Sequence, residues 1–119
     1  MGHDIPPGHD IALCTFRVKP GSEQRFEALL ARHAPTLRRL GLATAEPSQC
    51  FRGLDDAGRP FYFEVLPWTD ARAVQTAHQN PEVQAIWNPM SECCEERGGR
   101  PPMEFPHAER LFVPRPAVR

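Results

Sequence analysis

An apolar run and a helical pattern follow each other between Phe61 and Glu96. The run from Phe61 to Leu66 combines three aromatic with two aliphatic residues, which is typical of a buried strand. A turn leads to Asp70, whose carboxylate can accept from the free backbone N–H groups of a helix that starts at Ala71. The stretch therefore predicts a strand that leads directly into a helix, and both need partners for their apolar sides.

Two prolines are expected to divide this helix. Asn80 and Pro81 predict a restart, with Asn80 as the cap and Pro81 in the first helical position. Pro89 lacks the N–H that a helix interior requires. We therefore expect a second break, which leaves Met90 to Glu96 as a separate turn or two.

The chain before this stretch predicts one strand and one helix. Ile11 to Val18 is typical of a strand, and Ser22 is expected to cap the helix that follows. Pro35 predicts a kink or a broken turn near Arg32, and Gly41 suits a left-handed C-cap. One side of the helix is apolar apart from a histidine, with Phe26, Leu29, Leu30, His33, Leu37 and Leu40 at helical spacing.

A hairpin and a final strand complete the pattern. Leu42 to Gly53 predicts an irregular strand in which Pro47 marks an edge or a bulge. Asp55 to Gly58 is a turn signal that leads into the strand at Phe61. Met103 to Val113 predicts the last strand, interrupted by Pro106.

The order of these elements predicts an α+β, ferredoxin-like βαββαβ fold, a four-stranded antiparallel sheet with two helices on one face. With 119 residues the chain is long enough for one core. We expect a flexible arm at residues 1–10, a single domain at 11–113 and a tail at 114–119.

Both faces of the first and third predicted strands are apolar, although two helices can cover only one face of the sheet. An uncovered second face would expose a large apolar patch to water. We therefore expect a homodimer in which the helix-free faces stack. In the first strand, one face carries Ile11, Leu13 and Thr15, and the other carries Ala12, Cys14, Phe16 and Val18. In the third strand, one face carries Phe61, Phe63 and Val65, and the other carries Tyr62 and Leu66.

Charge and composition exclude several classes of partner. The net charge is -1, so we expect no nucleic-acid partner, and no apolar run approaches the length of a membrane span. The N-terminus lacks a signal-peptide pattern, which predicts a cytoplasmic protein. The four cysteines form no zinc-binding spacing, so we expect reduced core thiols, no disulfide and no structural metal.

Two short motifs resemble the dimeric α+β barrel superfamily. One is Val18 to Gly21 before an amphipathic helix, and the other is Trp68 to Asp70 followed by His78, Asn80-Pro81 and Val83. Within the superfamily the chain is most similar to the antibiotic biosynthesis monooxygenase-like family. That resemblance implies a dimeric α+β barrel and a cofactor-independent oxygenase of aromatic compounds. The haem-degrading branch is less similar, since its first strand carries an asparagine that Ile11 to Val18 lacks.

The chain departs from the family pattern at two places. A second histidine that often follows the proline is replaced here by Glu82, and an acid of the third strand is replaced by Leu66. Glu64, two residues earlier on the same strand face, could substitute for that acid with a shift in geometry.

The candidate site consists of His78 as a catalytic base and Tyr62, Glu64 and Trp87 as ligand-binding residues. A histidine can take a phenolic proton near neutral pH, after which an electron-rich ring can react with oxygen. Trp87 could stack on such a ring. No metal and no cofactor are implied.

A second interpretation explains the same residues without catalysis. Trp87 is then a core residue, Tyr62 and Glu64 face a partner or solvent, and His33 is a hydrogen-bonded core residue. Two hypotheses stay open at this point. One is a monooxygenase-like enzyme acting on a phenolic or quinol-type compound. The other is a noncatalytic dimeric module that binds a hydrophobic small molecule or serves only as a structural or stress-related protein.

Overall fold

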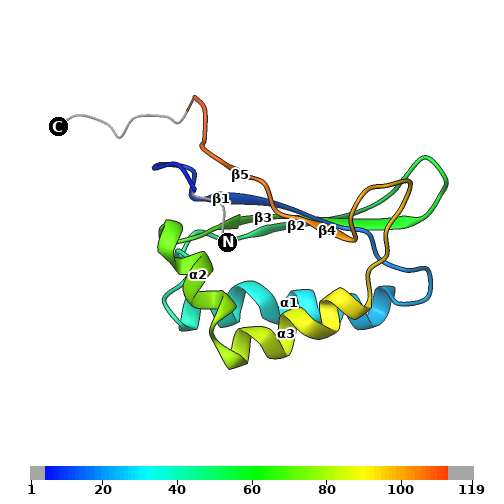
Figure 1. Ribbon diagram of the computed structural model, residues 1–119, viewed down its shortest axis with the longest axis horizontal. Helices are drawn as coiled ribbons and strands as arrows, with labels where there is room; N and C mark the ends of the chain where they lie inside the picture. Colours follow the sequence, from blue (N-terminus) through cyan, green and yellow to red (C-terminus); the bar gives the residue numbers. More distant parts are fainter. Residues whose placement is uncertain (1–4, 113–119) are drawn as a thin grey trace.

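An antiparallel sheet forms one layer of the molecule and three helices form the other (Figure 1). The computed structural model describes residues 5–112, so the predicted tail at 114–119 and the first four residues of the predicted arm lie outside it. The helices are α1 (Glu23–Arg39), α2 (Ala71–His78) and α3 (Pro81–Glu92). The strands are β1 (Ile11–Phe16), β2 (Gln49–Leu54), β3 (Pro60–Pro67), β4 (Met103–Glu104) and β5 (His107–Ala108).

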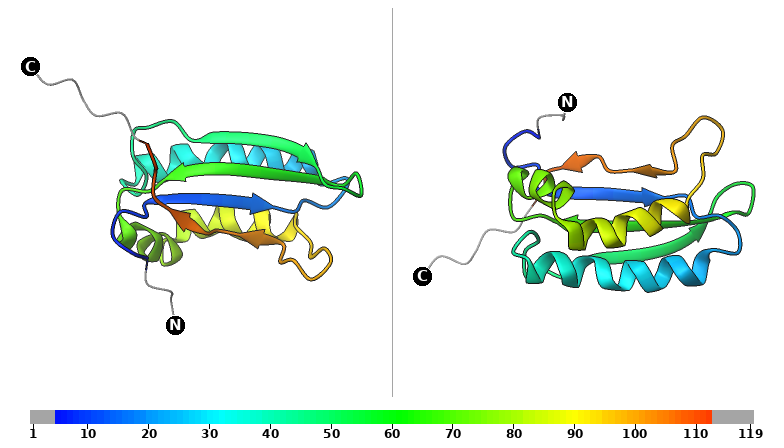
Figure 2. Two further views of the ribbon diagram at one scale, coloured as in Figure 1. Left: turned by 90° about the horizontal axis from the view of Figure 1, so that it is seen from above. Right: turned by 60° about the horizontal axis from the view of Figure 1, so that its bottom comes forward.

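The strand order across the sheet is β2-β3-β1-β4, and β5 also pairs with β1. The predicted last strand is thus split into β4 and β5 around Phe105 and Pro106, because proline cannot donate to the ladder. Figure 2 shows both short strands beside β1 on the edge away from β2. The predicted βαββαβ order is present, with the second helix divided into α2 and α3.

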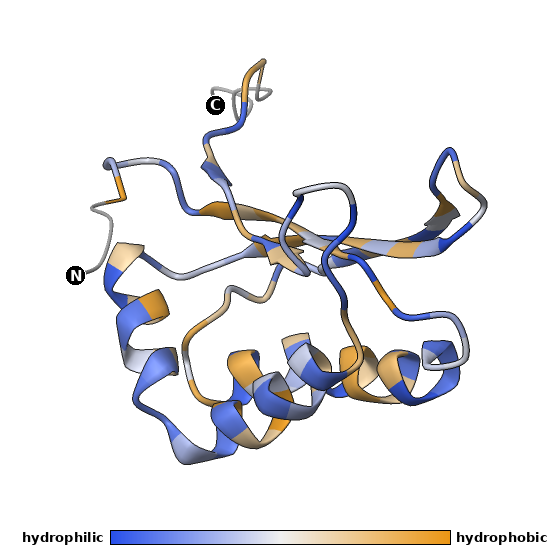
Figure 3. Ribbon diagram, turned by 45° about the vertical axis from the view of Figure 1, so that its right-hand side comes forward, coloured by the Kyte–Doolittle hydropathy of each residue, from blue (hydrophilic) through white to orange (hydrophobic). Residues whose placement is uncertain are grey.

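Burial alternates along the two central strands, so their even-numbered side chains face the helices. Figure 3 shows that hydrophobic residues occur in both the sheet and the helices. The apolar side of α1 packs against this face, and Phe26 lies 5.0 Å from Phe16 and 4.9 Å from Tyr62 between ring centroids. The odd-numbered side chains form the helix-free face and are partly exposed. The buried strand residues on the helix side are Ala12, Cys14, Phe16, Tyr62, Glu64 and Leu66.

Several helix and turn signals take the predicted form. The carboxylate of Asp70 accepts from Ala73 N, and the side chain of Asn80 accepts from the backbone of Glu82 and Val83. Gly41 has φ +77°, and the amide after it donates to the carbonyl of Leu37, which closes α1 in a Schellman arrangement. These local signals fix where the helices begin and end.

Three local expectations were wrong. Neither Pro35 nor Pro89 breaks its helix, because the residues four positions earlier, Ala31 and Ala85, are exposed and their carbonyls can bond to water. The hydroxyl of Ser22 makes no capping bond; the carboxylate of Glu23 instead accepts from Gly21 N.

The second strand begins later than expected. Between Leu42 and Ser48 only Ala43 forms a bridge, to Trp68, and the regular ladder starts at Gln49, beyond Pro47. No helix among residues 5–112 combines the length and the apolar character needed to cross a bilayer.

Candidate functional site

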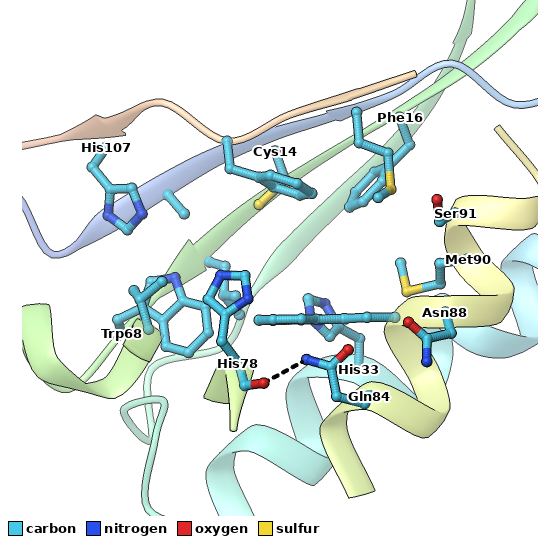
Figure 4. Close-up of a pocket in the computed structure, with 16 residues that line it drawn as sticks. Cys14, Phe16, His33, Trp68, His78, Gln84, Asn88, Met90, Ser91 and His107 are labelled. Carbon is cyan, nitrogen blue, oxygen red and sulfur yellow. Dashed lines mark hydrogen bonds between the residues drawn. The ribbon is translucent and has the colours of Figure 1, made fainter. Parts of the chain in front are cut away.

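A cavity of about 290 Å³ lies between the helix-facing side of the sheet and the helices α2 and α3 (Figure 4). Its walls are mainly apolar and aromatic, with three imidazoles and a few neutral polar groups. The lining residues are Ala12, Cys14, Phe16, His33, Leu66, Trp68, Val74, His78, Gln84, Trp87, Asn88, Met90, Ser91, Met103, Phe105 and His107.

The sheet side of the cavity follows from strand alternation. Ala12, Cys14 and Phe16 occupy consecutive helix-facing positions of β1 and form its roof. Met103 pairs with Phe16 and His107 pairs with Ala12, so both edge residues lie beside this roof. Phe105, which is 46% exposed, stands between them where the strand is interrupted. The cavity is therefore bounded on one side by the short strands β4 and β5.

A buried hydrogen-bonded chain connects Glu64, His33 and Trp87. Nδ1 of His33 lies 2.8 Å from a carboxylate oxygen of Glu64, and the indole N–H of Trp87 donates to Nε2 of His33 at 2.8 Å. Since Nε2 accepts, the proton of the neutral ring resides on Nδ1 and is donated to Glu64. The chain fixes both the tautomer of His33 and the direction of the indole N–H.

Glu64 is fully buried beneath the cavity and does not line it. Its second oxygen lies 3.8 Å from the thiol of Cys50, which donates to it from the neighbouring strand β2. Burial first, and then the Glu64 charge, raise the pKa of Cys14 well above the ordinary value. The same two causes raise the pKa of Cys50 to about 11. A carboxylate thus influences the thiols on both adjacent strands.

His78 is the last residue of α2 and lies at the edge of the cavity. Its ring packs edge-on against Trp87 with 4.9 Å between centroids. Its backbone carbonyl accepts from the amide of Gln84 at 2.9 Å, which fixes the junction between α2 and α3. Within residues 5–112 its imidazole has no hydrogen-bond partner, so the ring is available to a ligand.

His107 on β5 is a cavity residue that the sequence reasoning missed. Its Nδ1 lies 3.3 Å from the backbone oxygen of His9, and a carbonyl can only accept. Nδ1 therefore carries the proton, which leaves a lone pair on Nε2. The signal for this residue was its even spacing with Met103 and Phe105 in the predicted last strand.

Tyr62 lies apart from this cavity. Its hydroxyl donates to Glu27 of α1, in an open groove of about 400 Å³ that also contains Arg52 and Cys50. Burial and the hydrogen bond to Glu27 raise the pKa of Tyr62 to about 12. The hydrogen bonds from Tyr62 and Arg52 lower the pKa of Glu27. The expectation that Tyr62 shares a ligand with His78 does not match this geometry.

Of the predicted site residues, His78 and Trp87 line the cavity together and Glu64 reaches it through His33. The alternative that Glu64 faces solvent or a partner is wrong, because its side chain is enclosed. His33 is buried and hydrogen-bonded, as the second interpretation held, and it also lines the cavity. The sequence contained a signal for the Glu64–His33 pair, since each is a polar residue on an otherwise apolar face of its strand or helix.

The cysteines are free, and three of them are buried. Cys50 is exposed on β2, contrary to the expectation that all four fill core positions, although its thiol is partly buried where it meets Glu64. Burial, with Cys93 as the next cause, raises the pKa of Cys94 to about 12. Across the described part of the chain, no three histidine, cysteine or acidic side chains are grouped as a metal site would require.

Two solved structures have folds similar to that of this chain. A conserved protein from Methanosarcina mazei Go1 superposes with a TM-score of 0.59 at 16% identity, covering 85% of this chain and 91% of that one. A dimeric ferredoxin-like protein of unknown function from Jannaschia sp. CCS1 superposes with a TM-score of 0.55 at 17% identity, covering 84% and 97%. The fold is ferredoxin-like. The predicted α+β fold class is thereby confirmed, and this likeness shows the fold alone.

No family model matches the chain, and no curated protein matches it. The ferredoxin-like fold hosts many functions, so a function for this chain has to be argued from the cavity itself.

Proposed function

We propose that this protein binds a small, neutral aromatic compound of the phenolic or quinol type in the cavity between sheet and helices. The observation that supports this most is the lining of the cavity, which combines aromatic and apolar walls with the imidazoles of His78 and His107. No aspartate, glutamate, lysine or arginine is among the described lining residues, which favours an uncharged ligand. Cavities of about 150 Å³ accept benzene, so about 290 Å³ has room for a larger ring system.

The two imidazoles give the ligand its polar contacts. Nε2 of His107 is an acceptor by virtue of the Nδ1 contact to His9, so it suits a hydroxyl donor. The His78 ring at the cavity edge has no hydrogen-bond partner among residues 5–112 and is proposed to accept a phenolic proton. A phenol or quinol satisfies both demands, because each needs an O–H group on a flat apolar body.

We further propose that the reaction is a cofactor-independent monooxygenation, as the resemblance to the antibiotic biosynthesis monooxygenase-like family implies. His78 removes the proton, and the electron-rich ring then supplies the electrons that reduce oxygen. A ring carbon loses its hydrogen and gains one oxygen atom, the O–O bond breaks, and the second oxygen leaves as water with that hydrogen and the phenolic proton. A phenol and O2 thus give a quinone and water. Trp87, against which His78 packs, supports the ligand from the helix side.

A noncatalytic binding role is the second candidate. The observation that favours it is the position of Glu64, whose oxygens are engaged by His33 and Cys50 rather than directed into the cavity. No acid then acts directly on the ligand. In this case the cavity holds the aromatic compound without converting it.

We propose that the working form is a homodimer with the helix-free faces of the sheets stacked. Phe51 is 53% exposed on that face, and its ring lies 6.5 Å from that of Phe63 between centroids. The Jannaschia protein is described as dimeric, which supports a dimer here. Such stacking would remove the apolar face from water.

The test is a ligand screen that records oxygen uptake and quenching of tryptophan fluorescence with 1-naphthol, 1,4-naphthohydroquinone and anthrone. Protein-free samples measure autoxidation. The enzyme proposal expects His78→Ala to abolish the protein-dependent uptake while the melting temperature changes little, since the His78 side chain is exposed. Gln75→Ala, at an exposed position of the same helix, serves as the matched control.

The outcomes separate the candidates. Quenching without oxygen uptake supports the noncatalytic role. Absence of both for every compound rejects the cavity as an aromatic site. A large fall in melting temperature of His78→Ala with unchanged ligand binding rejects the role of His78.

A further inference from the structure

The hydrogen bonds of the Glu64–His33–Trp87 chain all donate in one direction, from Trp87 through His33 to Glu64. The carboxylate accepts from Nδ1 of His33, and Nε2 of the same ring accepts the indole N–H, each at 2.8 Å. Hydrogen bonds in such a chain polarise one another, particularly in a low-dielectric interior. The negative end is Glu64 and the other end is the ring of Trp87.

The presence of Glu64 is costly for the core. The side chain is 0% exposed, and its hydrogen-bond partners among the described residues are His33 and Cys50, neither of which is a permanent cation. A carboxylate buried without lysine or arginine is unfavourable compared with an apolar residue of similar size. Packing alone therefore does not explain this residue, and its effect on its partners has to be considered.

The effect reaches the cavity through Trp87. The carboxylate makes Nε2 of His33 a stronger acceptor, and a stronger acceptor draws the indole proton away from its ring. The electron density of the indole then rises, and with it the negative character of the ring face. Because the N–H edge points at His33, the surface with which Trp87 lines the cavity belongs to the rest of the ring.

We propose that Trp87 is an electron-rich stacking surface that selects an electron-poor planar ring, such as a quinone, and that Glu64 and His33 are the positioning residues that make it so. This inference rests on the proposed function, because it assumes an aromatic ligand in the cavity. It adds which redox form of the ligand is held more tightly: the quinone that the proposed oxygenation produces, rather than the phenol or quinol that enters, is the preferred stacking partner, and it binds more tightly than a hydrocarbon of the same shape.

The arrangement in Figure 4 agrees with this assignment. His33 lies on the helix side of the cavity, and Cys14 and Phe16 lie on the sheet side. In the proposed binding mode a flat ring lies between these layers, with Trp87 of α3 on one side and apolar strand residues on the other. The polarised surface is thus presented from one side only.

The experiment compares two probes of matched outline, 2,3-dimethyl-1,4-naphthoquinone and 2,3-dimethylnaphthalene. The methyl groups block addition of the Cys14 thiol to the quinone. The wild-type protein should bind the quinone more tightly by about three- to tenfold, the range that an aromatic pair contributes. A charge-transfer absorption band between indole and quinone should accompany binding.

Two variants test the role of the chain. Glu64→Gln keeps an acceptor for His33 but removes the charge, and Trp87→Phe keeps an aromatic surface without the N–H. Both should lower the quinone preference, which is the ratio of the two affinities, towards one. In Glu64→Gln the charge-transfer band should move to shorter wavelength, which a purely structural role would not cause.

The results distinguish a failure of this inference from a failure of the proposed function on which it rests. If neither probe binds the wild-type protein, the aromatic site itself is wrong. If both bind equally, or if the preference and the band are unchanged in both variants, only the selection by Trp87 is overturned. Should Glu64→Gln not fold, Trp87→Phe alone decides through the preference ratio.

Discussion

The Nε2 atom of His33 and the indole nitrogen of Trp87 lie 2.8 Å apart, although 54 positions separate the two residues in the chain. With the Glu64 contact, this bond connects α1, α3 and β3 in one buried chain. Each member restricts the next, because the carboxylate sets the tautomer that the indole requires. The cavity wall is consequently tied to the core of the sheet.

The first prediction concerns the energetic coupling of Glu64 and His33. His33→Leu strands a buried carboxylate and should cost about 3–5 kcal/mol of unfolding free energy. Glu64→Leu strands the Nδ1–H of His33 and should cost about 1–3 kcal/mol. The double variant should cost clearly less than the sum, since neither partner is then left alone. Urea unfolding of the four proteins measures this, and additivity within about 0.5 kcal/mol would contradict it.

The second prediction concerns the reactivity of Cys50. Its pKa of about 11, against an ordinary 9.0, is due to burial first and then to Glu64. At pH 8 the reactive thiolate should be about a hundredfold scarcer than for an ordinary thiol, so alkylation by iodoacetamide should be correspondingly slow. Mass spectrometry after timed labelling gives the rate.

The same labelling tests the charge on Glu64. Glu64→Gln should accelerate Cys50 alkylation several-fold, because one cause of the raised pKa disappears. Glu27→Gln is the control, since Glu27 lies in the same groove and does not raise the Cys50 pKa. Equal rates in the wild type and Glu64→Gln would argue against an ionised Glu64.

The third prediction concerns Tyr62, which is the sole tyrosine of the chain. Absorbance at 295 nm should show its ionisation near pH 12, since burial and Glu27 favour the neutral phenol. A pKa raised by folding means that this stabilisation is present below about pH 10 and is lost as the pH rises towards 12. Glu27→Gln should lower the midpoint. An ionisation midpoint near pH 10, with a circular dichroism spectrum that shows the protein still folded, would contradict the buried, Glu27-bonded environment of Tyr62.

The fourth prediction concerns assembly. Multi-angle light scattering should give a dimer mass at micromolar concentration, and Phe63→Glu should give monomers, because a charge would be buried in the apolar interface. Gln75→Glu changes the charge equally at an exposed position of α2 and should remain dimeric. A wild-type monomer would exclude the stacked sheets.

The fold was largely predictable because its signals are local. Strand alternation gave the two faces of β1 and β3, and Asp70, Asn80 and Gly41 marked helix ends through bonds to nearby residues. The prolines were misjudged because the energetic cost of a proline within a helix depends on whether the carbonyl four residues earlier can bond to water. That exposure is a property of the packed molecule.

The site was less predictable because its contacts join distant parts of the chain. Tyr62 and Glu64 share a strand face, yet Glu27 engages one and His33 the other, and pattern alone does not distinguish these partners. His78 was found through the motif resemblance and Trp87 as an aromatic residue that could stack on a ligand. His107 depended on a pairing between β5 and β1 across almost the whole chain.

Because the last strand is interrupted between β4 and β5, one wall of the cavity is built from short segments on which the rest of the fold depends little. Met103, Phe105 and His107 contribute to the wall, yet each short strand is only two residues long and pairs with β1 alone. Substitutions confined to these three positions would change which molecules are admitted and leave the long strands and helices intact. A lineage could therefore acquire new ligands through this edge, and a directed-evolution library would begin there.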